Sequence, residues 1–252
     1  MASPHLGRNL ADHCDLDVVY SLREKQSVDR LLRPRPEAAW ALLRYVFGRR
    51  GPLTSTVVEG GAFAYSSQPA QTPDLQFHFL PAAGAEAGIT ATRPGYGCTL
   101  NTYFVRPRSR GSVQLASSDP TAQPRIDPNY LADDYDVEVS IEGVRWMREI
   151  MSQPAMARHV ESEHHPGASV GNTTDALIRY ARGFARTAYH PVGTCAMGSG
   201  DESVVAPDLK LRGARALRVC DASVMPDLVS SNTQAATVMI AEKAADLILA
   251  EA

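Results

Sequence analysis

Residues 98–106 read Cys-Thr-Leu-Asn-Thr-Tyr-Phe-Val-Arg, a run of β-branched and aromatic residues that is typical of a β-strand. Similar runs occur at residues 16–20, 54–65, 75–80 and 112–117, with clusters of Pro, Gly and Ser between them. Short runs of this kind, separated by turn-forming residues, predict an antiparallel sheet.

Helical spacing of apolar residues predicts helices around this block of strands. One helix is expected at residues 36–47 and three more at 132–151, 173–182 and 236–248. A short apolar run at 217–220 precedes the last helix and is predicted to be a strand. A block of strands followed by helices, and then by one strand–loop–helix, predicts an α+β fold for most of the chain.

The composition is that of an ordinary globular protein. Of the 252 residues, 44% are hydrophobic and 21% charged, and the formal net charge is −3, which does not favour binding to nucleic acid or to an anionic membrane. No apolar stretch is long enough to span a bilayer and no secretory leader is recognised, so we expect a cytoplasmic protein. The four cysteines form no C-x-x-C pair, and reduced thiols are expected.

Two other motifs resemble functional sites, but a role in catalysis or metal binding is not favoured for either of them. Residues 167–171 match G-x-S-x-G, but polar residues 161–166 stand where a hydrolase would have an apolar strand. No G-x-G-x-x-G or G-x-x-x-x-G-K phosphate loop is present. A group of His and Glu residues lacks the H-E-x-x-H spacing, so a solvated polar loop is favoured and no metal site is predicted: His159, Glu161, Glu163, His164 and His165.

Two further segments are candidates for catalysis. In residues 189–198 (YHPVGTCAMG), His190 stands before a proline and close to two glycines, an arrangement that can aim an imidazole. Taken alone, the pattern is better explained by a hydrogen-bonded structural histidine, because histidines are common in loops for reasons other than catalysis. Residues 221–233 lie between a predicted strand and a helix start, where free N–H groups can meet anionic or carbonyl oxygens. Ordinary helix capping by Ser231 or Asn232 is the alternative there.

These two segments, taken in order, closely resemble the C-terminal signature of the glucose–methanol–choline (GMC) flavoprotein oxidoreductases, in particular choline dehydrogenases. Residues 6–13 (LGRNLADH), 106–113 (RPRSRGSV) and 118–126 agree with it, so the resemblance spans almost the whole chain. It implies the antiparallel-sheet substrate domain of that family, together with the last strand and helix of its FAD-binding α/β domain.

The resemblance implies FAD-dependent oxidation of a primary or secondary alcohol by hydride transfer to the flavin. His190 matches the family's base, and Asn232 matches a second residue at the substrate oxygen. Asp221 and Ala222 match a segment beside the FAD, and Thr233 matches the start of the helix by the flavin. Less specific matches place Glu59 and His78 in the substrate pocket, although an exposed acid at a strand end would explain Glu59 equally.

The chain also departs from the family pattern. Members begin with a βαβ unit that carries G-x-G-x-x-G, and that unit is absent here. We therefore expect a C-terminal fragment that is inactive alone and that binds a small alcohol. A chain that supplies the missing FAD-binding half is the other expected partner. The alternative is a non-catalytic remnant or partner subunit. The expected segments are 1–15 on the FAD-domain side, 16–188 as substrate domain and 189–252 returning to the FAD domain.

Overall fold

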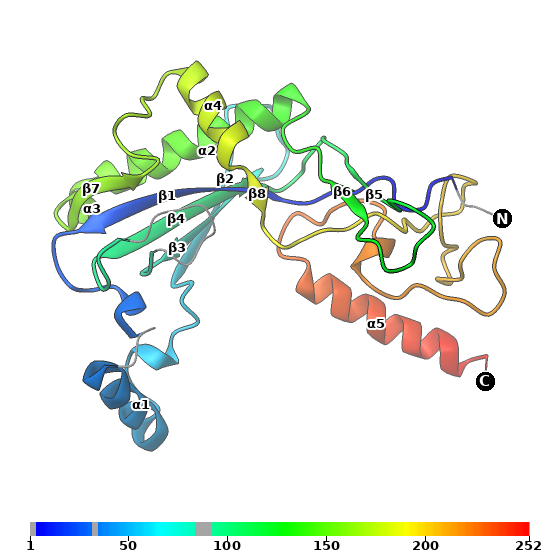
Figure 1. The fold of residues 1–252 in the computed structure, drawn as a ribbon, viewed down its shortest axis with the longest axis horizontal. Coiled ribbons are helices and arrows are strands. Elements are labelled where there is room, and N and C mark those ends of the chain that lie inside the picture. Colours follow the sequence, from blue (N-terminus) through cyan, green and yellow to red (C-terminus); the bar gives the residue numbers. More distant parts are fainter. Residues whose placement is uncertain (1–3, 32–34, 84–91, 252) are drawn as a thin grey trace. The chain divides into compact units, whose positions relative to one another are not determined.

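The computed structural model describes residues 4–31, 35–83 and 92–251 (Figure 1). The chain forms two compact units. Unit 1 consists of residues 1–14, 104–137 and 186–252, and unit 2 of residues 15–103 and 138–185. The sheet-bearing unit 2 is thus built from two chain segments, and the expected functional segments 1–15, 16–188 and 189–252 stay predictions.

The sheet confirms the predicted antiparallel arrangement. Asp15 of β1 lies opposite Tyr103 of β4, and Gly61 of β2 lies opposite His78 of β3. The strand order is β2 (Gly60–Ala64), β3 (Leu75–Leu80), β4 (Gly97–Phe104), β1 (Cys14–Leu22) and β7 (Val160–His165).

One face of the sheet is apolar and is covered by helices. Figure 1 shows α2 (Asp134–Ser152) and α4 (Thr174–Phe184) on the same side of the sheet. Gly143 lets α2 approach closely, since a Cβ there would lie only 2.8 Å from the Thr102 side chain. The opposite face is unusual because it carries polar side chains that are mostly buried: Asp15, Asp17, Gln76, His78, Asn101 and Tyr103.

The other elements of unit 2 are short, except for α1. This helix places Trp40 and Phe47 at 63% and 84% exposure, so the helix predicted at 36–47 is present but carries its apolar stripe on the outside. The elements are η1 (Val28–Leu31), α1 (Pro36–Gly48), η2 (Pro52–Thr54) and α3 (Pro154–Ala157).

Unit 1 has little regular structure and a core of its own. Val192, Val224 and Ile240 belong to this core, which joins the loop after His190, the segment before α5, and α5 itself. Its elements are β5 (Ser112–Gln114), β6 (Arg125–Asp127), β8 (Arg186–Thr187), η3 (Ala222–Val224) and α5 (Gln234–Leu249).

Several local predictions were wrong. The polar residues 159–165 include strand β7, which lies at the end of the sheet and pairs with β1; polar side chains suit such an edge. Residues 217–220 form no strand, because only the isolated bridge between Lys210 and Arg218 pairs this segment. The strand predicted at 54–65 is confined to β2, because η2 includes Thr54 and Val57 has a positive φ of 74°, which a strand does not allow.

Two properties bear on the environment of the chain. All four cysteines are free thiols, as expected, and burial raises the pKa of Cys98 to about 12. Within the described ranges, no helix combines the length and the apolar character needed to cross a membrane.

Candidate active site

Unit 1 brings together the two residues predicted to be catalytic. The side-chain nitrogen Nδ2 of Asn232 lies 3.2 Å from Nε2 of His190. His190 is only 8% exposed, whereas Asn232 is exposed on the loop that leads into α5. The two residues are 42 positions apart in the sequence, so this proximity is produced by the tertiary fold.

The backbone around His190 is fixed by an antiparallel contact with the segment that precedes β1. Ala11 and Val192 exchange both backbone hydrogen bonds, at 3.1 and 2.9 Å, and the His190 N–H donates to Oδ1 of Asp12 at 3.0 Å. Gly193 has φ of +92°, and a Cβ there would lie 2.2 Å from the carbonyl oxygen of Asn9. Only glycine suits this position, and the close approach fixes the loop on which His190 lies.

His13 is a buried neighbour of His190 and is not among the residues predicted for the site. Nδ1 of His13 lies 3.0 Å from Nδ1 of His190, and the two rings meet edge to face. Nε2 of His13 lies 3.2 Å from the carbonyl oxygen of Val105. Burial lowers the pKa of His13 to about 4, although backbone hydrogen bonds with Val105 and Val229 oppose the change, so this ring is neutral at pH 7.

Asp12 links the same segment to Tyr130. The Tyr130 hydroxyl donates to Oδ2 of Asp12 at 2.5 Å, while Oδ1 receives the His190 N–H. Burial, followed by this contact with the carboxylate, raises the pKa of Tyr130. The only sequence signal for Asp12 and His13 is their place in the matched stretch 6–13, because neither residue lies in a locally distinctive pattern.

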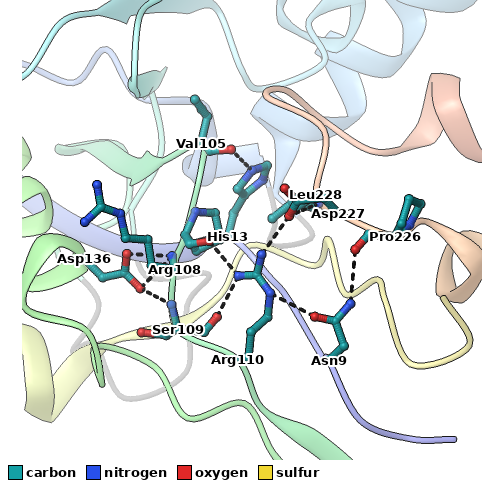
Figure 2. A network of polar contacts seen from close by, with 11 residues as sticks. Asn9, His13, Val105, Arg108, Ser109, Arg110, Asp136, Pro226, Asp227 and Leu228 are labelled. Carbon is teal, nitrogen blue, oxygen red and sulfur yellow. Dashed lines mark hydrogen bonds and ion pairs between the residues drawn. The ribbon is translucent and has the colours of Figure 1, made fainter. Parts of the chain in front are cut away.

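A second polar network holds the loops around this cluster (Figure 2). The Arg110 guanidinium donates to Oδ1 of Asn9 at 3.1 Å, to the Pro107 carbonyl at 2.7 Å and to Oδ1 of Asp227 at 2.8 Å. One fixed, planar donor group thereby joins three segments that are distant in sequence. Arg110 therefore fixes the loop preceding α5 and the loop preceding β1 relative to each other.

The residues predicted to contact FAD lie at the two ends of the segment that joins η3 to α5. Asp221 is exposed, and its carboxylate accepts from the backbone N–H of Ser223 at 2.8 Å, so it caps η3. Ala222 begins η3 and is half-buried. Thr233, rather than Ser231 or Asn232, is the residue immediately before α5, and it is 8% exposed. The cofactor roles of these residues stay predictions.

The predicted substrate-pocket residues belong to unit 2. Glu59 is exposed just before β2, and its backbone N–H donates to the Phe79 carbonyl at 3.0 Å. His78 is half-buried in β3, and its Nε2 lies 3.0 Å from Nε2 of Gln76. Burial lowers the pKa of His78, and a hydrogen bond with Asn101 opposes this effect. Glu59 therefore immediately precedes β2, whereas His78 lies on the neighbouring strand β3, and their binding roles stay predictions.

The alternative chemistries gain no support from the geometry. In the part of the chain that the structure describes, no group of three or more His, Cys, Asp or Glu side chains is arranged to hold a metal ion. The G-x-S-x-G residues 167–171 follow β7, but the next helix begins only at Thr174, so the sharp strand-to-helix turn of a nucleophile elbow is not formed.

Comparison with known proteins identifies the family. The profile described as GMC oxidoreductase matches residues 107–241, which is more than half of the chain. The chain belongs to the GMC oxidoreductase family. The resemblance seen in the sequence is thereby confirmed. The chain is homologous to enzymes of this family.

Relatives support the same assignment. The chain is 43% identical to an alcohol dehydrogenase [acceptor] of Pseudomonas putida over 246 residues, covering 98% of this chain and 44% of the relative. It is 36% identical to an oxygen-dependent choline dehydrogenase of Escherichia coli, with 97% and 44% covered. The GMC chain thus spans a little under half the length of these curated relatives.

A solved structure agrees in fold. A formate oxidase of Aspergillus oryzae, studied for modification of its FAD, superposes with a TM-score of 0.90 at 28% identity, covering 99% of this chain and 48% of that one. FAD, the cofactor implied by the resemblance, is confirmed as the cofactor of the family.

Proposed function

We propose that His190 and Asn232 hold the oxygen of a primary or secondary alcohol during its FAD-dependent oxidation to a carbonyl. The observation that carries the proposal is the 3.2 Å contact between Nδ2 of Asn232 and Nε2 of His190. It places a potential proton acceptor and an N–H donor side by side at one end of α5. The names of the relatives, alcohol and choline dehydrogenases, support this class of substrate.

The two side chains have complementary tasks. Nε2 of His190 takes the hydroxyl proton as the carbon–oxygen double bond forms, because an imidazole is the side chain best suited to accept a proton near neutral pH. The amide N–H of Asn232 then stabilises the negative charge that develops on the same oxygen. FAD, when bound, supplies the acceptor for the two electrons and the hydrogen of the alcohol carbon.

The start of α5 fits the electron-rich part of a flavin. The Thr233 side chain makes no capping hydrogen bond within the described part of the chain, and the first bond inside the helix is that from the Thr237 N–H to the Thr233 carbonyl. The backbone N–H groups of the first turn and the positive end of the helix dipole are thus available to an electron-rich group that binds beside Thr233. Thr233 and its neighbouring backbone are the residues that would hold the flavin here.

We further propose that catalysis requires a nucleotide-binding portion in addition to these 252 residues. The sequence has no G-x-G-x-x-G turn to bind the pyrophosphate of FAD. In α5, Val238 and Met239 are 48% and 58% exposed, which is the apolar surface that such a portion would cover. Supplied in the same chain or as a separate one, this portion would complete the site; the alternative of a non-catalytic remnant predicts no activity after it is supplied.

A double-mutant cycle on the flavin-loaded enzyme tests the proposed roles. His190→Ala should lower kcat/KM for an alcohol by about 10²–10⁴-fold, and Asn232→Ala by about 10²–10³-fold. Because both groups act at one oxygen atom, the double variant should lose less than the product of the two effects. Flavin content must equal that of the parent protein, and His5→Ala, at an exposed position, serves as the control.

Full multiplicativity of the two losses would show that the side chains act at different atoms. Near-parental activity of both single variants would refute the proposal altogether.

A further inference from the structure

The contact between His13 and His190 contains a single proton whose position can be worked out. Their Nδ1 atoms are 3.0 Å apart, a hydrogen-bond distance, so one nitrogen donates and the other accepts. His13 is fully buried and His190 is 8% exposed, so the contact lies in the protein interior. A neutral imidazole has one N–H and one bare nitrogen, and the tautomer follows from what the other nitrogen contacts.

The other nitrogen of His13 decides the question. Its Nε2 lies 3.2 Å from the Val105 carbonyl oxygen, which only accepts hydrogen bonds, so Nε2 carries the proton of this neutral ring. Nδ1 of His13 is then bare. The proton between the two rings therefore belongs to Nδ1 of His190, and Nε2 of His190 keeps its lone pair.

The contact at the far side of His190 agrees with this assignment. Nε2 of His190 lies 3.2 Å from the Asn232 side-chain nitrogen, which donates and cannot accept. From the Val105 carbonyl through both rings to Asn232, each of these three contacts then pairs a donor with an acceptor. The reverse assignment would set two acceptors against each other at Val105 and two donors at Asn232.

The separation of the two rings is fixed by the backbone on both sides. The Ala188 N–H donates to the His13 carbonyl at 2.9 Å, and the Val192 N–H donates to the Ala11 carbonyl at 2.9 Å. Between these bonds, Asp12 accepts the His190 N–H. The main chain at His13 and the main chain at His190 are therefore fixed relative to each other.

We propose that His13 is a positioning residue: by accepting the Nδ1–H of His190, it holds that ring in the tautomer whose Nε2 carries a lone pair and no proton. The proposal rests on the proposed function insofar as Nε2 of His190 is the base. When Nε2 gains the hydroxyl proton, the Nδ1–H bond to His13 becomes charge-assisted and stronger, which favours the proton transfer. His13 would do, as a neutral ring, what a carboxylate does for the histidine of a serine protease triad.

The direct test is ¹⁵N NMR of the ring nitrogens in the 252-residue chain, labelled at histidine and measured at pH 7. Bare and protonated ring nitrogens resonate in separate regions, and comparison with His13→Leu and His190→Ala assigns the two rings. We expect a protonated Nδ1 and a bare Nε2 for His190, and the reverse for His13. A bare Nδ1 on His190 in the parent chain would overturn the proposal, whatever the variants do, and no flavin is needed for the measurement.

Two variants then test the consequence for catalysis in the flavin-loaded enzyme. His13→Leu removes the acceptor at similar size, whereas His13→Asn keeps an acceptor oxygen close to where Nδ1 lies. We expect His13→Leu to lower kcat by about 10–100-fold, with little change in KM. This is the range known for residues that orient a metal-ligating side chain through a hydrogen bond, a comparable task. His13→Asn should recover most of that loss.

The outcomes separate the two proposals. Equal losses in His13→Leu and His13→Asn would indicate a purely structural role and overturn the inference. If His190→Ala were fully active, the proposed function would fail, while the NMR result would still decide the tautomer.

Discussion

Acidification should destabilise unit 1 through His13. The pKa of this ring is about 4 in the folded protein, against 6.5 for an ordinary histidine. Because the pKa is lower in the folded protein, His13 is protonated in the unfolded chain and neutral in the folded chain between these two pH values. The contribution to stability is complete above pH 6.5 and is lost as the pH falls towards 4. At roughly 1.36 kcal/mol per tenfold change in proton affinity, the loss amounts to about 3 kcal/mol.

Urea unfolding of the parent chain and of His13→Asn, over a series of pH values from 7 to 4, measures this quantity. The free energy of unfolding of the parent should fall more steeply than that of the variant, and the difference between them should change by about 3 kcal/mol over the series. His5→Asn, at an exposed position, should follow the parent. A difference in free energy of unfolding between the parent and His13→Asn that stayed constant within about 0.5 kcal/mol over the series would refute the claim that burial lowers the pKa of His13.

Three further predictions concern cofactor, loop and ion pair. The 252-residue chain alone should retain no flavin after incubation with FAD and gel filtration, because it has no pyrophosphate-binding turn; stoichiometric absorbance in the flavin band would contradict this. Gly193→Ala should lower the melting temperature by several degrees, since its φ is +92° and a Cβ would lie 2.2 Å from the Asn9 carbonyl. Gly183→Ala in α4 has open space and should be neutral or slightly stabilising; equal effects would refute the steric argument. Arg148→Met should cost about 3 kcal/mol in urea unfolding, because Glu163, paired with Arg148 at 2.7 Å and largely buried, would lose its counter-charge. Adding Glu163→Gln should recover part of that loss, and no recovery would contradict the assignment.

The sheet was predictable because its central strands carry a strong local signal. Residues 75–80 and 98–106 combine β-branched and aromatic side chains, and both runs form strands. The polar run at β7 gave no such signal, since an edge strand is specified mainly by its pairing with β1. Local patterns also could not show that α1 carries its apolar side chains outside, because that depends on which neighbours pack against it.

The candidate site was predictable only in part. His190 and Asn232 stand in distinctive segments, and the family resemblance joined them before the structure placed them 3.2 Å apart. His13 is 177 residues from its partner, and nothing around it indicates that its ring would meet another imidazole. The tautomer of His190 depends on that contact and on the Val105 carbonyl, so it is a property of the tertiary structure that no local sequence pattern encodes.

The central claim is that His190 accepts the proton of an alcohol that FAD oxidises. It is tested most directly by mixing the flavin-loaded enzyme with an alcohol in the absence of oxygen and following the rate at which the flavin band bleaches. His190→Ala, with the same flavin content as the parent, should be slower by about 10²–10⁴-fold. A loss of less than about threefold, far below the range of a catalytic base, would contradict the claim and leave His190 as a structural histidine of its loop.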